Sequence, residues 1–153
     1  MKIKEIKCAG LRGATPEGGW TSELRPEDCV HTLIAVHTDE GLIGLGSVFA
    51  NDSLVRGVLQ LLEPLYRDES ALEPERVSEK LHQNTFWQGR GGSITHTISG
   101  IDIALWDLLG QAAGQPCYQS WTERERSGLE LQLATVWVIL ELETEGLAKR
   151  APA

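Results

Sequence analysis

The feature that most constrains how this chain folds is one long apolar stripe in residues 94–112. Its apolar residues recur at alternating steps of four and three: Ile94, Ile98, Ile101, Leu105, Leu108 and Ala112. Residues with this spacing fall on one side of an α-helix. The stripe therefore predicts a long helix that buries one continuous face against other elements.

Two acidic residues lie within this predicted helix. At about 100° per residue, Asp102 falls about 40° from Ile98, on the flank of the buried face, and Asp107 falls about 180° from Ile98. A carboxylate at the margin of a core is costly unless it is hydrogen-bonded, so Asp102 should have fixed donors. Asp107 is expected on an exposed face that tolerates substitution. On opposed faces the two cannot act as an acid/base pair, and both are interpreted as structural.

The first residues predict a strand followed by a loop. Residues 2–9 have strand character, although the spacing of Ile3 and Ile6 breaks strict alternation and indicates a β-bulge. Residues 10–28 are rich in glycine and proline around a single aromatic residue, Trp20. This composition is typical of a loop.

The clearest strands form a hairpin over residues 30–49. Residues 30–38 alternate between two faces, and Asp39-Glu40-Gly41 supplies a short turn that leads into residues 42–49. Gly44 and Gly46 leave one face of the returning strand flat. A flat strand face suits the close approach of a helix.

After residue 50 the hydrophobic period changes to that of helices. Asp52 or Ser53 is expected to cap a first helix, which Pro64 should end or kink. Pro74 suits the first turn of a second helix, and the glycines of residues 89–92 interrupt the chain before the apolar stripe. Strands that come first and helices that follow favour the α+β class.

Composition excludes several functional classes. A chain of 153 residues can bury a core of its own, and its net charge of −8 argues against binding nucleic acid or an anionic membrane. The cysteines Cys8, Cys29 and Cys117 have neither zinc-binding nor paired spacing, which favours reduced thiols. Because no signal peptide and no apolar run of about 20 residues is recognised, we expect a cytoplasmic protein with no membrane partner.

A motif within the predicted helix resembles a known family. Ser99-Gly100-Ile101-Asp102-x-Ala104-Leu105-Trp106-Asp107, closed by Gly114-Gln115-Pro116, is similar to the signature of the mandelate racemase/muconate lactonizing enzyme group of the enolase superfamily. The resemblance covers residues 1–116. It implies an N-terminal capping domain, built as a three-stranded antiparallel meander followed by a helical bundle.

The resemblance also implies a chemistry. Such enzymes abstract the proton α to a carboxylate with a Lys or His base, and Mg²⁺ stabilises the enediolate. In the family, these catalytic and metal-binding residues stand on a separate barrel. We therefore expect no catalytic residue, no metal ligand and no bound Mg²⁺ in this chain. Gly89-Arg90-Gly91-Gly92 resembles the corresponding segment of sugar-acid dehydratases, so a small carboxylate or sugar acid is the expected substrate. Whether the protein forms a homo-oligomer is left open.

Four residues are candidates for contact with that substrate, each with an alternative. Trp20 could cover the mouth of the barrel or pack on the sheet. Phe49 and Asn51 lie where a second substrate-facing loop is expected, although Asn51 is equally suited to cap a helix. Arg90 could reach a carboxylate or hydroxyl, or lie solvated on the surface.

The end of the chain departs from the family pattern. Residues 117–153 form a divergent tail, interpreted as the remnant of the first strand and helix of a TIM-like barrel. The chain would then be a truncated or frame-disturbed copy of a longer enzyme. The alternative is a standalone, non-catalytic α+β domain that acts as a binding or interaction module.

Overall fold

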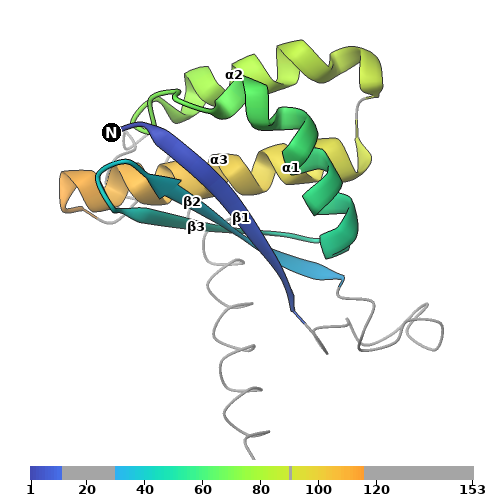
Figure 1. Cartoon of the computed structure of the whole chain (residues 1–153), viewed down its shortest axis with the longest axis horizontal. Coiled ribbons are helices and arrows are strands. Elements are labelled where there is room, and N and C mark those ends of the chain that lie inside the picture. Colours follow the sequence, from blue (N-terminus) through green and yellow to red (C-terminus); the bar gives the residue numbers. More distant parts are fainter. Residues whose placement is uncertain (12–29, 90, 116–153) are drawn as a thin grey trace, which may run out of the picture. The chain divides into compact units, whose positions relative to one another are not determined.

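The computed structural model describes residues 1–11, 30–89 and 91–115, and Met1–Gly114 forms one compact unit. The predicted tail of residues 117–153 lies outside this description. The elements follow in the order β1 (Ile3–Leu11), β2 (His31–Thr38), β3 (Ile43–Val48), α1 (Asp52–Tyr66), α2 (Pro74–Thr85), the short 3₁₀ helix η3 (Phe86–Gln88) and α3 (Gly92–Ala113) (Figure 1). The strands form one antiparallel sheet in the order β1-β2-β3, which confirms the predicted α+β meander.

The register of the sheet follows the alternation in the sequence. In β2 the buried residues are Thr32, Ile34, Val36 and Thr38, all of which face the helices. Gly41, at φ 88°, occupies the left-handed region that the tight turn between β2 and β3 requires. The predicted bulge is present between Ile3 and Glu5, and β1 extends to Leu11, two residues into the segment expected to be a loop.

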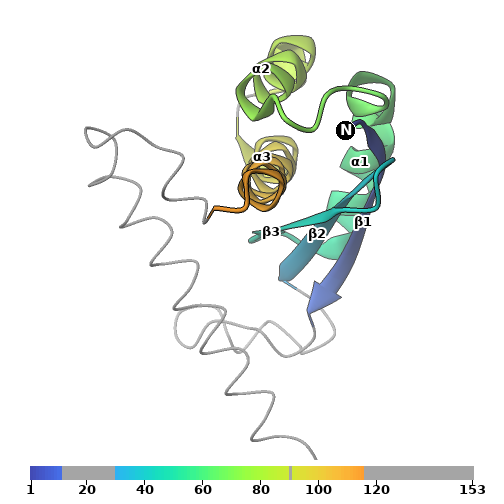
Figure 2. The same ribbon diagram turned by 90° about the vertical axis from the view of Figure 1, so that its left-hand side faces the viewer.

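The helices cover one face of the sheet (Figure 2). α1 packs on β1 and β2, α3 packs on β3 and β2, and α2 packs on both α1 and α3. The side chains that close the core between these layers are fully buried, among them Ile3, Ile34, Leu62, Leu81, Ile101 and Leu105. The other face of the sheet carries half-exposed and exposed residues, the latter including Ile43 and Leu45.

α3 approaches β3 so closely that only glycine fits between them. A Cβ atom at Gly46 would overlap the carbonyl oxygen of Gly100, and one at Gly44 would overlap that of Ala104. A Cβ atom at Gly100 would in turn meet the side chains of Val48 and Ile34. The predicted close approach of a helix to a flat strand is therefore confirmed.

Helix boundaries differ from the sequence expectations in small ways. The N-cap of α1 is Asn51, whose Oδ1 accepts a hydrogen bond from the Ser53 backbone N–H at 2.9 Å. The helix runs through Pro64 and ends at Tyr66, within the same turn. Pro74 does begin α2. The apolar stripe of α3 is buried from Ile98 to Leu108, whereas Ala112 is exposed.

The expected placement of Asp107 on an exposed face was wrong, because Asp107 is half-buried. Its Oδ2 accepts hydrogen bonds from the Leu45 backbone N–H and from Gln111 Nε2, both at 2.9 Å. Gln111 Nε2 also donates to the Ile43 carbonyl oxygen at 2.9 Å. A helical wheel built around one buried face assigns the opposite side to solvent, but α3 contacts both β3 and α2. Asp107 and Gln111 therefore bond the outer edge of β3.

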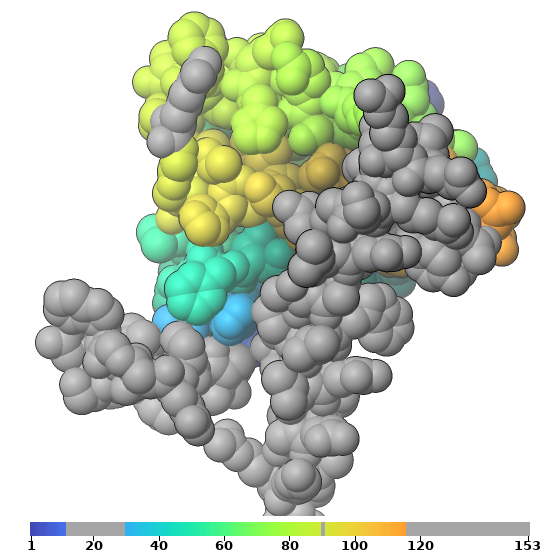
Figure 3. All heavy atoms as spheres, turned by 180° about the vertical axis from the view of Figure 1, so that it is seen from behind, coloured from blue at the N-terminus to red at the C-terminus, as the bar shows by residue number. Residues whose placement is uncertain are grey.

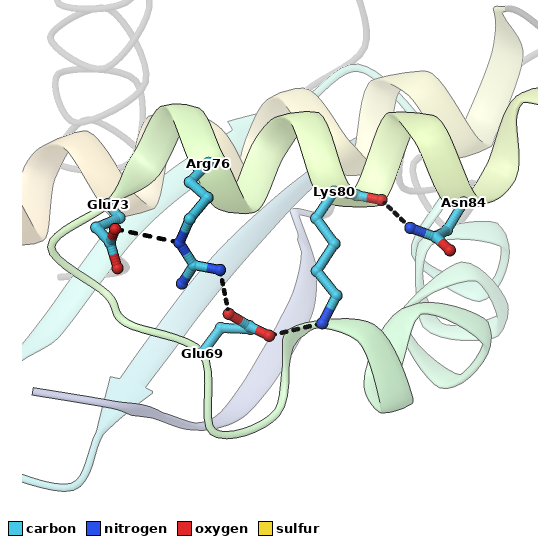
Figure 4. Close-up of polar contacts among 5 residues, drawn as sticks. All are labelled: Glu69, Glu73, Arg76, Lys80 and Asn84. Carbon is cyan, nitrogen blue, oxygen red and sulfur yellow. Dashed lines mark hydrogen bonds and ion pairs between the residues drawn. The ribbon is translucent and has the colours of Figure 1, made fainter.

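The start of β1 is bonded by the connection between α1 and α2. The Ile3 backbone N–H donates to the Glu69 carbonyl oxygen at 2.9 Å, and the Asp68 N–H donates to the Ile3 carbonyl oxygen at 3.0 Å. The Glu69 carboxylate pairs with Arg76 at 2.7 Å and with Lys80 at 2.6 Å (Figure 4). These contacts bond the connection between α1 and α2 to the start of β1 on one side and to α2 on the other.

We predict that Gly46→Ala destabilises the domain by about 2 kcal/mol, because the added methyl group overlaps backbone rather than a movable side chain. Gly57→Ala is the matched control, since Gly57 lies inside α1 with open space around it. The control should be stabilised by up to about 1 kcal/mol, the helix penalty of glycine. Urea unfolding measures both variants, and equal midpoints would contradict the close approach.

We predict that Asp107→Leu costs about 1 kcal/mol and speeds hydrogen exchange at the Leu45 amide, which loses its acceptor. Asp107→Asn retains an oxygen at the same position and should leave this exchange rate near that of the unmodified protein. Hydrogen exchange followed by NMR reports this amide individually. Unchanged protection of Leu45 in Asp107→Leu would show that the side chain does not bond the strand edge.

Candidate functional site

Two of the predicted substrate-contacting residues lie together at one end of the sheet. Phe49 directly follows β3, and its side chain is 53% exposed. Its ring meets that of His31 edge to face, with the centroids 5.0 Å apart and the planes at 77°. This contact favours one orientation of an exposed aromatic ring.

The turn from Phe49 into α1 is held by polar contacts. The Thr32 hydroxyl donates to the Ala50 carbonyl oxygen at 2.7 Å, which ties the turn to β2. Asn51 adopts the capping role that was its alternative interpretation. Contact of Phe49 or Asn51 with a substrate stays a prediction.

His31 is the neighbour that the sequence analysis missed. The signal was available, because β2 and β3 pair about a turn centred on residue 40, with Thr32 opposite Val48 and His37 opposite Ile43. The same register places His31 opposite Phe49. Leu11 pairs with His31 from the other side, so β1 and β2 both reach this end of the sheet.

The other two candidates, Trp20 and Arg90, lie outside the described residues. Gly89 and Gly91, on either side of Arg90, have φ values of 110° and 107°. They line a groove of about 730 Å³ together with His82, Phe86 and Thr95. Viewed from behind, α2, α3 and β3 lie in successive bands on this side of the molecule (Figure 3).

Asp102 is the acidic group with the most distinctive environment. It lies between α3 and α2, where it receives side-chain hydrogen bonds from Ser78 and Trp106. These are the fixed donors that the sequence predicted. Burial nevertheless raises the pKa of the Asp102 carboxyl above its usual value, against the opposing effect of these bonds and of His82.

The described residues do not supply a metal centre. Over 1–11, 30–89 and 91–115, no three His, Cys, Asp or Glu side chains come close enough to hold an ion. Mg²⁺ prefers several carboxylate oxygens and water in a near-octahedral arrangement. The residues in these ranges do not fit that requirement, so no catalytic step through Mg²⁺ is derived from them.

A profile of the family described as mandelate racemase / muconate lactonizing enzyme, N-terminal domain, matches residues 26–120. This chain belongs to that family. The matched residues contain β2, β3, the helices and the α3 motif with Asp102 and Asp107.

Sugar-acid dehydratases are among the relatives of this family member. It is 41% identical over 123 residues to a D-galactonate dehydratase family member from Paenibacillus sp. (strain JDR-2), covering 77% of this chain and 26% of that protein. It is 28% identical over 99 residues to a D-mannonate dehydratase from Novosphingobium aromaticivorans, covering 63% of this chain and 24% of that protein. The chain thus spans about a quarter of the length of these relatives.

A solved structure supports the same fold. The crystal structure of a putative dehydratase from Zymomonas mobilis ZM4 is matched with a TM-score of 0.62 and 33% sequence identity, over 77% of this chain and 29% of that one. Within the described residues of this family member, no helix has the length and apolar character needed to cross a membrane.

We predict that Asp102→Asn gains stability relative to the unmodified protein as pH rises from 4 to 7. The folded-state pKa of Asp102 is raised, so the folded state binds more protons than the unfolded state in this window. The unmodified protein therefore loses stability as pH rises through the folded-state pKa, and Asn abolishes that loss. Urea midpoints across pH measure the effect.

Glu79→Gln is the control for this pH series, because Glu79 is an exposed acid on the neighbouring α2. Its profile should follow that of the unmodified protein. A constant difference between Asp102→Asn and the unmodified protein at every pH would contradict the burial of Asp102.

Proposed function

We propose that this chain is the capping domain of a Mg²⁺-dependent enolase-superfamily enzyme that abstracts the α-proton of a carboxylate substrate. Dehydration of a sugar acid is the reaction we favour. The observation that carries this proposal is the 41% identity to a D-galactonate dehydratase family member over 77% of the chain. The predicted cytoplasmic location belongs to the same proposal.

The geometry at the end of the sheet supports a role in substrate contact. Phe49 is exposed, His31 contacts its ring edge to face, and the Thr32 hydroxyl bonds the following turn. A side chain on a rigid support can contact the distal end of a substrate and exclude water from a reacting centre. We assign Phe49 and Asn51 to this contact, with Trp20 and Arg90 as further members.

We further propose that the chain is inactive alone. It spans about a quarter of the length of its relatives, and its described residues do not form a Mg²⁺ site. Catalysis depends on sites rather than on folds. The proton-abstracting base and the metal ligands would therefore come from a part of the enzyme outside this chain.

A chimera tests the proposal. Residues 1–116 replace the matching part of the Paenibacillus relative, and turnover of a panel of sugar acids, including D-galactonate and D-mannonate, is measured with Mg²⁺. We expect the chimera to dehydrate at least one sugar acid and the isolated chain to show no turnover. In the chimera, Phe49→Ala should lower kcat/KM by about tenfold, whereas Leu61→Ala, an exposed residue of α1, should not.

Two results would contradict this function. One is turnover by the isolated chain that is lost when a residue of the chain is replaced. The other is a folded, Mg²⁺-binding chimera that turns over no member of the panel, which would favour the non-catalytic interaction module instead.

A further inference from the structure

The two aromatic rings at the end of the sheet differ in how they are flanked. β2 is the central strand, so His31 lies between Leu11 of β1 and Phe49, which follows β3. β3 is the last strand of the sheet within the described residues, so no further strand flanks Phe49 there. Phe49 therefore depends on His31 for its cross-strand contact, whereas His31 has a neighbour on each side.

The backbone at this end of the sheet is held by a different residue. Thr32, next to His31, is fully buried, and its hydroxyl donates to the Ala50 carbonyl oxygen at 2.7 Å. Successive residues of a strand point to opposite faces. Thr32 thus bonds the turn after Phe49 from the face that the helices cover, and His31 contacts the ring on the other face. Replacing His31 should therefore change the orientation of the ring and leave the backbone of the turn in place.

The Phe49 side chain has alternative orientations that its backbone does not exclude. It is 53% exposed, and the χ1 torsion of a side chain has three staggered positions. The edge-to-face contact with His31 favours one of them. The energy of such a contact changes the ratio of two orientations by about two- to tenfold.

The His31 imidazole is not engaged by another polar group. Over the described residues, it makes no hydrogen bond or ion pair, and its ring contact is the one with Phe49. A second histidine, His37, lies on the same face of β2 and is also half-buried, but it pairs with Ile43 and Glu5 at the far end of the strand. His37 therefore provides a matched control of the same residue type.

We propose that His31 is a positioning residue, which holds the Phe49 ring in the orientation in which Phe49 contacts the distal end of a sugar acid. This inference rests on the proposed function, which assigns Phe49 to the substrate. Sugar acids with carbon chains of different length place their distal ends at different distances from the carboxylate. The orientation of the ring therefore determines which acid is accepted, and His31 acts on specificity through Phe49.

NMR of the full chain tests the positioning without a substrate. Three-bond couplings report χ1 of Phe49, and we expect one dominant orientation in the unmodified protein. His31→Ala should distribute the ring among several orientations, whereas His31→Phe keeps an aromatic ring in the pair and should retain the dominant one. The urea midpoints of both variants should stay near that of the unmodified protein, because His31 lies on the sheet face away from the core.

The chimera with the Paenibacillus relative measures the effect on the substrate. For the sugar acid that the chimera dehydrates fastest, His31→Ala should lower kcat/KM about fivefold, with most of the change in KM. It should also reduce the ratio of kcat/KM between D-galactonate and a five-carbon sugar acid. His31→Phe should restore both quantities to within about twofold, and His37→Ala should change neither.

A double-mutant cycle shows whether His31 acts through Phe49. In the Phe49→Ala chimera, the added His31→Ala should change kcat/KM by less than about twofold, because the ring that His31 positions is absent. Equal losses in both backgrounds would show that His31 acts independently of Phe49, and would overturn the proposal.

The proposal is also overturned if χ1 of Phe49 is the same in His31→Ala as in the unmodified protein, or if His31→Phe is as impaired as His31→Ala. An active chimera whose kcat/KM is insensitive to His31→Ala rejects this role of His31 and leaves the capping function standing. A folded chimera that turns over no sugar acid rejects the proposed function, and with it the role of His31 toward a sugar acid.

Discussion

The approach of the α3 backbone to the β3 backbone is the constraint on which the rest of the domain depends. The carbonyl groups of Gly100 and Ala104 occupy the space above Gly46 and Gly44. Four residues of a helix rise about 6 Å, and two residues of a strand span about 6.6 Å. The two glycines therefore match one helical turn, which aligns α3 along β3 in the opposite direction. α1 and α2 then pack around a helix whose position is already set.

Elements with a repeating pattern could be predicted from the sequence. The hairpin and its helix partner could be predicted from the alternation of β2, the turn at Gly41 and the flat face at Gly44 and Gly46. Each of these features reflects a local geometric requirement. The environment of Asp107 could not be predicted in this way. Its role depends on a strand edge 62 residues earlier in the chain, which no helical wheel contains.

The candidate site was predictable only in part. Phe49 and Asn51 lie together because the same turn carries both, and the hairpin register would have added His31. Trp20 and Arg90 stand in segments rich in glycine, where neither period 2 nor period 3.6 fixes a direction. Their residue types suggest contact with a substrate, but the residues next to them in the sequence do not predict where their side chains lie.

One carboxylate couples two distant parts of the domain. Glu69 binds Lys80 and Arg76 on successive turns of α2, while its own backbone carbonyl accepts the Ile3 N–H. If α2 separates from this connection, Glu69 loses both ion pairs. Glu69 is also the residue that bonds the first strand. The first turns of α2 and the start of β1 should open as one cooperative unit in native-state exchange rather than fray independently. A displacement of α2 would thereby be linked to the β1 edge of the sheet.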